Sequence, residues 1–151
     1  MRDTTPAGLG RGVSQIYKNL TASVSRGRLS ALDRDRMLSR LHGCLEWGPE
    51  LKEAGAVIEA VFEDIPLKKR VLSEIEQQVS KDCLIASNTS AIPIGELASA
   101  LKSPERLLGM HYFSPVDKMP LLEIIRTDRT PTEICARAVA LGLKQGKVCR
   151  L

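Results

Sequence analysis

The chain has 151 residues, of which 43% are hydrophobic and 26% are charged, so it is long enough for one globular domain with a buried core. Only 3% of the residues are aromatic, which argues against base stacking on nucleic acids, and no apolar run approaches the roughly 18 residues of a membrane span. The four cysteines are widely separated, so we expect free thiols and no zinc site.

Basic residues gather at the start of the chain. Residues 1–40 hold eight Lys and Arg against three acidic residues, and the whole chain has a net charge of +4. Such a segment suits a phosphate-bearing ligand, and it would also suit RNA, an anionic surface or an organelle transit peptide, although most charged faces are merely solvated. The helix signals in the same segment favour a folded structure.

Two helices are predicted within this basic segment. Thr5 before Pro6 matches an N-cap followed by proline at the first helical position. Apolar residues then recur at helical spacing, at Leu9, Val13, Ile16, Leu20 and Val24. Gly27 would end this helix, and a capping box would open a second one over 30–41. We therefore predict a basic helical hairpin over 1–42.

Strands alternate with helices later in the chain, after a loop at 42–55 that has room for a short strand. The apolar run 56–62 predicts a buried strand, and Asp64 opens a helix with one apolar face. Further strands are expected at 83–87, 106–110, 121–126 and from 147, and further helices at 93–101 and 131–145. This alternation predicts an α/β fold with a doubly wound parallel sheet, whose ligands bind at the carboxyl ends of the strands.

Three polar residues lie at or in these predicted strands and could form a catalytic set. Ser90 follows one strand, His111 ends another, and Glu123 lies inside a third. If the strands are neighbours, a hydroxyl, a base and a carboxylate that orients the base would meet. The alternatives are a structural histidine, an ordinary strand carboxylate, and a serine that caps the helix before Pro93.

Three longer stretches favour the catalytic interpretation over these alternatives. They are 59–64 (EAVFED), 86–90 (ASNTS) and 109–116 (GMHYFSPV). Together they resemble the NAD-binding domain of the L-3-hydroxyacyl-CoA dehydrogenase family, and most closely the multifunctional, trifunctional α-type enzymes of fatty-acid β-oxidation. The similarity is dense over 56–148, which implies an incomplete Rossmann-type fold from which the helical hairpin projects.

The resemblance implies a reaction and roles for the polar set. In the family, NAD accepts a hydride from C3 of an L-3-hydroxyacyl-CoA, and 3-ketoacyl-CoA is formed. His111 then corresponds to the general base that removes the hydroxyl proton, and Glu123 to its partner. Ser90 corresponds to a residue that hydrogen-bonds the reacting oxygen or the cofactor.

Binding roles are implied in the same way. Asp3 matches the acidic residue that hydrogen-bonds the adenosine ribose of NAD, and Glu63 and Lys68 match residues that line the nicotinamide-ribose side. Without the resemblance, Lys68 would be taken for a solvated helix lysine and Glu63 for a carboxylate at a helix entry. Asn19 and Arg26 lie where the family's hairpin contacts the CoA part of the substrate.

Other parts of the family pattern are missing. The chain has no first strand with a Gly-x-Gly-x-x-Gly turn, and Gly8-x-Gly10-x-Gly12 falls inside a predicted helix. The C-terminal helical domain of the family, which supplies dimer contacts, is also absent. We therefore expect a truncated domain that binds NAD weakly by itself. The alternative is an inactive short product that keeps at most acyl-CoA or partner binding. The resemblance also implies a location in the mitochondrial matrix.

Overall fold

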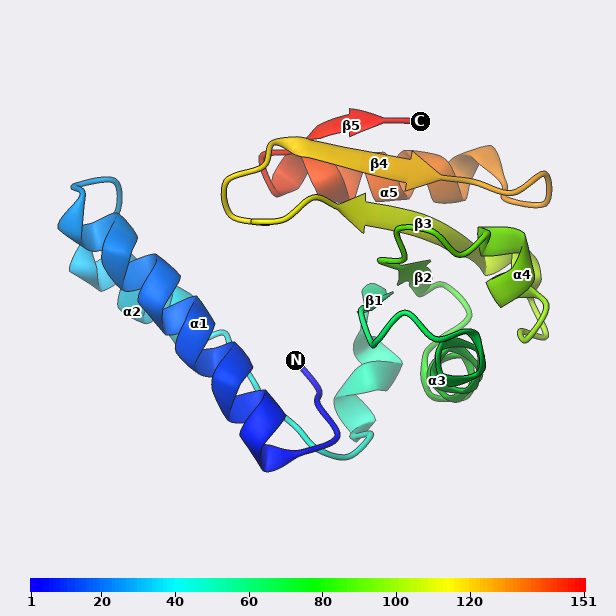
Figure 1. Ribbon diagram of the computed structural model, residues 1–151, viewed down its shortest axis with the longest axis horizontal. Coiled ribbons are helices and arrows are strands. Elements are labelled where there is room, and N and C mark those ends of the chain that lie inside the picture. Colours follow the sequence, from blue (N-terminus) through cyan, green and yellow to red (C-terminus); the bar gives the residue numbers. More distant parts are fainter. The chain divides into compact units, whose positions relative to one another are not determined.

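The computed structural model describes all 151 residues, which form two compact units, Met1–Gly48 and Pro49–Leu151. The first unit is built on two helices, and the second contains a β-sheet with helices on it (Figure 1). The boundary between the units falls inside 42–55, the stretch for which the sequence predicts a loop. None of the helices combines the length and the apolar character needed to cross a bilayer.

The first unit contains the predicted helical hairpin. Helix α1 spans Pro6–Ser25, and helix α2 spans Ala31–Leu38. Both predicted N-caps are confirmed, because the hydroxyls of Thr5 and Ser30 each accept a hydrogen bond from a backbone amide at 3.0 Å. Helix α2 ends before the expected Leu41, since the last amides of this stretch bond to carbonyls three residues back and tighten the final turn.

A short extended pair joins the segments on either side of the hairpin. Arg2 and Cys44 form an isolated parallel bridge, and the amide of Asp3 donates to the carbonyl of Cys44 at 3.3 Å. The stretch 42–55 has room for a short strand, and the structure has a single bridging residue there, Cys44. The Gly8-x-Gly10-x-Gly12 stretch lies within α1, as expected.

The second unit has a five-stranded sheet whose strands lie side by side in sequence order. The strands are β1 Ala56–Glu59, β2 Leu84–Ser87, β3 Leu107–Tyr112, β4 Leu121–Ile125 and β5 Val148–Arg150. Strands β1 to β3 are parallel, β4 runs antiparallel to β3, and β5 is parallel to β4. The sheet is mixed, so the prediction of a parallel sheet is wrong at β4. The connection 113–120 is too short for a parallel crossover, which needs about a dozen residues or more.

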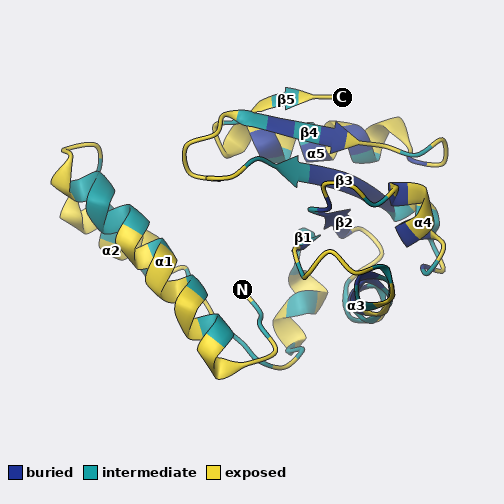
Figure 2. Ribbon diagram, viewed as in Figure 1, coloured by how far each residue is buried: buried dark blue, intermediate teal, exposed yellow.

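Helices cover both faces of this sheet. Helices α3 (Ile65–Gln78) and α4 (Ile94–Ala98) pack on one face, and α5 (Thr132–Lys144) packs on the other. The core beneath α5 consists of Leu84, Ala86, Leu108, Met110, Leu122, Ile124 and Ala138. Figure 2 shows the buried residues concentrated in the sheet, whereas α1 and α2 carry none. Short 3₁₀ helices occupy Pro49–Glu53 and Pro104–Arg106.

Candidate functional site

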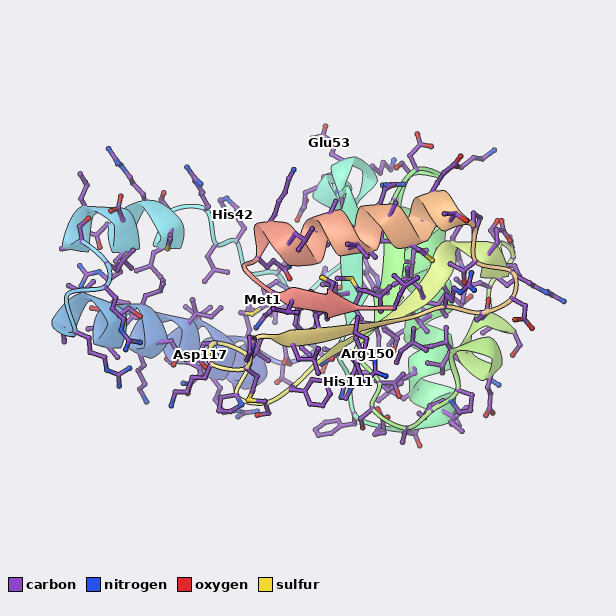
Figure 3. All side chains as sticks on the ribbon, turned by 90° about the horizontal axis from the view of Figure 1, so that it is seen from above. Met1, His42, Glu53, His111, Asp117 and Arg150 are labelled. Atoms are coloured by element: carbon purple, nitrogen blue, oxygen red, sulfur yellow. The ribbon has the colours of Figure 1, made fainter.

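The predicted imidazole and carboxylate meet on neighbouring strands. His111 of β3 lies directly opposite Glu123 of β4 in the antiparallel register. The Nδ1 atom of His111 lies 3.0 Å from Oε2 of Glu123, and the two side chains are 18% and 34% exposed. His111 lies on the side of the sheet away from α5 (Figure 3). A carboxylate on Nδ1 favours the tautomer in which Nε2 is free to accept a proton.

An aromatic ring completes the surroundings of this histidine. The ring of Phe113 lies 4.4 Å from that of His111, with an angle of 47° between the two planes. Phe113 lies two residues after His111, just beyond the end of β3. The imidazole is therefore held by a carboxylate at one nitrogen and by an apolar ring alongside, which leaves few orientations open to it.

Ser90 lies beyond β2 and is exposed. Its amide donates to Oε1 of Glu63 at 3.1 Å, and its hydroxyl forms no hydrogen bond with His111 or Glu123. The alternative role as a helix cap is also not seen, because Pro93 occupies the cap position of α4. The hydrogen bonds thus group Ser90 with Glu63, and the role of its hydroxyl in the chemistry stays a prediction.

Glu63 follows β1 and accepts hydrogen bonds from the turn that follows the neighbouring strand β2. The Thr89 hydroxyl and the amides of Ser90 and Ala91 all donate to its Oε1 atom. Burial raises the pKa of Glu63, but these hydrogen bonds and the charge of Lys68 outweigh it and lower the pKa to about 2. The side chain is still 39% exposed, so this ionised carboxylate can accept further hydrogen bonds from a ligand.

Lys68 is not a solvated helix lysine, because its side chain is completely buried. Its Nζ atom lies 2.8 Å from Oε1 of Glu59 and 3.4 Å from Oε2 of Glu63. Glu59 also accepts from the Ser87 hydroxyl at 2.6 Å. Sequence reasoning missed Glu59, Ser87 and Thr89 as parts of this site. The available signal was Glu59 itself, since a carboxylate inside a buried strand requires a partner.

The remaining predicted binding residues belong to the first unit. Asp3 ends the extended segment before α1, and a hydrogen bond from the Thr5 amide at 2.9 Å is the largest cause that lowers its pKa. Asn19 lies on α1, where its Oδ1 accepts from Gln15 at 2.8 Å. Arg26 is the exposed residue that follows α1 as its C-cap. Their predicted contacts with ribose and CoA stay predictions.

A hollow of about 520 Å³ opens at the carboxyl end of β1. It is lined by Ile58, Ala60, Asn88, Tyr112, Val116, Asp117, Gln145 and Lys147. The Asn88 side chain accepts from the amide of Tyr112 at 2.8 Å, and the Tyr112 hydroxyl donates to Gln145 at 2.8 Å. Asn88 therefore ties the turn after β2 to the end of β3, which is a shaping role.

The sequence matches a known family over nearly its whole length. The family described as 3-hydroxyacyl-CoA dehydrogenase, NAD binding domain, matches residues 1–149. Among curated proteins, the chain is 40% identical over 147 residues to the fatty acid oxidation complex subunit alpha of Shewanella frigidimarina. That alignment covers 97% of this chain and 21% of the relative, so the chain spans about a fifth of the relative's length.

Solved structures share the fold closely. FadB2 of M. tuberculosis superimposes with a TM-score of 0.93 at 36% identity, covering 98% of this chain and 52% of that one. The (S)-3-hydroxybutyryl-CoA dehydrogenase PaaH1 of Ralstonia eutropha gives a TM-score of 0.94 at 34% identity, covering 99% of this chain and 52% of that one. The relatives named here are bacterial, so they lend no support to a mitochondrial location.

Proposed function

Since this chain belongs to the 3-hydroxyacyl-CoA dehydrogenase family and matches its NAD-binding domain, we propose that it serves the NAD-dependent oxidation of an L-3-hydroxyacyl-CoA to a 3-ketoacyl-CoA. The observation that supports this proposal most directly is the contact of 3.0 Å between Nδ1 of His111 and Glu123. This pair has the form of a general base with an orienting carboxylate.

The chain's own residues divide the work as follows. Nε2 of His111 accepts the proton of the substrate hydroxyl, while Glu123 holds the ring and stabilises the imidazolium that forms. NAD, when bound, would supply the acceptor for the hydride that leaves C3 as the C–O bond becomes a carbonyl. Ser90 then donates its hydroxyl hydrogen to the reacting oxygen or to the cofactor.

Glu63 fits a cofactor rich in hydroxyl groups. Its pKa of about 2 keeps it ionised at neutral pH, and an ionised carboxylate only accepts hydrogen bonds. It lies just beyond the carboxyl end of β1, the edge at which sheets of this class bind their ligands. A ribose diol supplies the matching donors. Asp3 would take the adenosine ribose, and Asn19 and Arg26 the CoA moiety.

Partners belong to the same proposal. A relative is a subunit of a fatty acid oxidation complex, and we assign this domain to β-oxidation by analogy. The same analogy adds two partners. One is a helical domain that completes the substrate pocket, and the other is a second copy or a larger multifunctional assembly. The location of the protein in the mitochondrial matrix remains a prediction from the resemblance.

The test compares the chain's two histidines. NADH-dependent reduction of acetoacetyl-CoA is measured for the unaltered chain, for His111→Gln, and for His42→Gln as the matched control in the other unit. We expect His111→Gln to lose about 10²–10⁴-fold in turnover with little change in NAD affinity, and His42→Gln to lose none. A rate for His111→Gln equal to a measurable rate of the unaltered chain would remove His111 from the mechanism.

A second function, acyl-CoA or partner binding without turnover, predicts a different result. The chain would bind acetoacetyl-CoA in calorimetry, and the reduction assay would show no rate above that without protein. Measuring binding and turnover on the same preparation separates the two functions.

A further inference from the structure

Lys147 follows α5, and its side chain bonds to the connection 113–120 between β3 and β4. Gly146 takes a φ of +75° after the last turn of the helix, which directs the chain toward β5. The half-buried side chain of Lys147 then donates from Nζ to two backbone carbonyls, that of Val116 and, at 2.7 Å, that of Met119. Hydrogen bonds from an ammonium are stronger than those between neutral groups, so the side chain fixes this part of the connection.

The two carbonyls belong to a compact turn inside the connection. The amides of Lys118 and Met119 both donate to the carbonyl of Pro115 at 2.9 Å. The end of the connection is tied by the residue that follows the lysine, since the amide of Val148 donates to the carbonyl of Pro120 at 2.8 Å. The turn is thus bonded internally, and the stretch after α5 sets its place.

The same stretch after α5 also holds the start of the connection. The hydroxyl of Tyr112, the last residue of β3, donates to Oε1 of Gln145 at 2.8 Å. Gln145 and Lys147 therefore bond to opposite ends of the connection. The pairing of β4 with β5 is made by the backbone and does not require the lysine side chain. What that side chain adds is the position of the connection.

The connection begins with the ring that lies against the histidine. Phe113 comes directly after β3, and its ring lies 4.4 Å from that of His111. Its backbone is held on one side by β3 and on the other by the turn that starts at Pro115, two residues further on. A shift of that turn is expected to move the ring of Phe113, and with it the apolar side of the imidazole's surroundings.

We propose that Lys147 is a positioning residue, which holds the turn of the connection in place and so keeps the Phe113 ring packed against His111. The lysine acts through Phe113 and not on the imidazole itself. This inference rests on the proposed function, because it takes His111 as the base. Its first test measures only the position of the two rings, so the inference and the proposed function can fail separately.

Proton NMR measures the contact of the rings without substrate or cofactor. The chain has two histidines and two phenylalanines, so the aromatic signals are few, and His42→Gln identifies those of His111. We expect a nuclear Overhauser cross-peak between the His111 and Phe113 rings in the unaltered chain, its loss in Lys147→Met, and its return in Lys147→Arg, which keeps a cation with several donors. The matched control is Lys144→Met, which removes an exposed lysine from the last turn of α5 and should leave the cross-peak unchanged.

Amide hydrogen exchange shows whether the turn itself is released. The amides of Lys118 and Met119 should exchange about tenfold faster in Lys147→Met, and at the original rate in Lys144→Met. In the acetoacetyl-CoA assay, kcat of Lys147→Met should fall about tenfold while KM stays within about twofold, because the surroundings of the base change and the binding residues do not.

Each outcome has a distinct meaning. An intact cross-peak in folded Lys147→Met overturns the inference, even if that variant is less stable, because the lysine is then merely structural. If Lys147→Met does not fold, Lys147→Gln, with a shorter and uncharged side chain, takes its place and must show the same loss. Failure of the unaltered chain to reduce acetoacetyl-CoA counts against the proposed function, and the cross-peak then decides the inference alone.

Discussion

Replacing Glu63 by glutamine should lower the stability of the second unit in a manner that depends on pH. The pKa of this carboxyl falls from an ordinary 4.5 to about 2 in the folded chain. A shift of that size corresponds to at most about 3.4 kcal/mol at neutral pH, since each pKa step is worth about 1.36 kcal/mol. The side chain is 39% exposed, and solvent screening reduces the expected figure to about 1–2 kcal/mol.

The direction with pH follows from the depressed pKa. The unfolded chain takes up the proton first, so the stabilisation is complete above pH 4.5 and is lost as the pH falls toward 2. The difference in unfolding free energy between the unaltered chain and Glu63→Gln should therefore be about 1–2 kcal/mol at neutral pH and shrink below pH 4.5.

Urea denaturation followed by far-UV circular dichroism measures this difference from neutral pH down to about pH 3. The matched control is Glu105→Gln, since Glu105 is an exposed carboxylate without a hydrogen bond or ion pair. It should show no difference at any pH. A destabilisation by Glu63→Gln that stays constant across the range, or none at neutral pH, would refute the assigned role of the hydrogen bonds from the turn after β2.

Three further substitutions test the packing of the second unit by urea denaturation. Gly142→Ala should destabilise by about 1–3 kcal/mol despite the better helix propensity of alanine, because the added Cβ would lie 2.5 Å from Sγ of Cys149; a gain in stability would contradict this. Gly95→Ala, with nothing within 4 Å of the added Cβ, should instead stabilise by up to about 1 kcal/mol, and a loss would show hidden crowding. Asn88→Leu should cost about 1–3 kcal/mol, since the amide of Tyr112 loses its acceptor; unchanged stability would mean that another group replaces it.

Most helices and strands can be predicted from local signals in the sequence, because the interactions that begin and end them involve residues only a few positions apart. Thr5 and Ser30 mark helix starts through side-chain bonds to amides three residues on. Gly146 follows α5 with a φ of +75°, a conformation that favours glycine. The apolar run predicts a strand up to 62, but β1 ends at Glu59, where the chain turns and the amide of Val61 donates to the Glu59 carboxylate.

The buried lysine was missed, although helical spacing contained the signal. Lys68 lies three, four and seven residues before Val71, Leu72 and Ile75, which are all buried on α3. A lysine on that stripe must be paired, and a glutamate in the preceding buried strand is the obvious partner. Periodicity can place both residues in the interior, but it cannot show that they face each other across the turn.

The antiparallel direction of β4 explains why His111 and Glu123 meet. Residues directly opposite in an antiparallel pair have side chains about 4.5–5.5 Å apart, and the reversed direction of β4 sets Glu123 opposite His111. In a parallel arrangement with aligned strand ends, Glu123 would lie level with Gly109, two residues or about 6–7 Å along β3 from the imidazole. A parallel β4 with its ends aligned to those of β3 would therefore separate the base from its carboxylate. The short connection 113–120, which forces the reversal, is what permits the candidate active site to form.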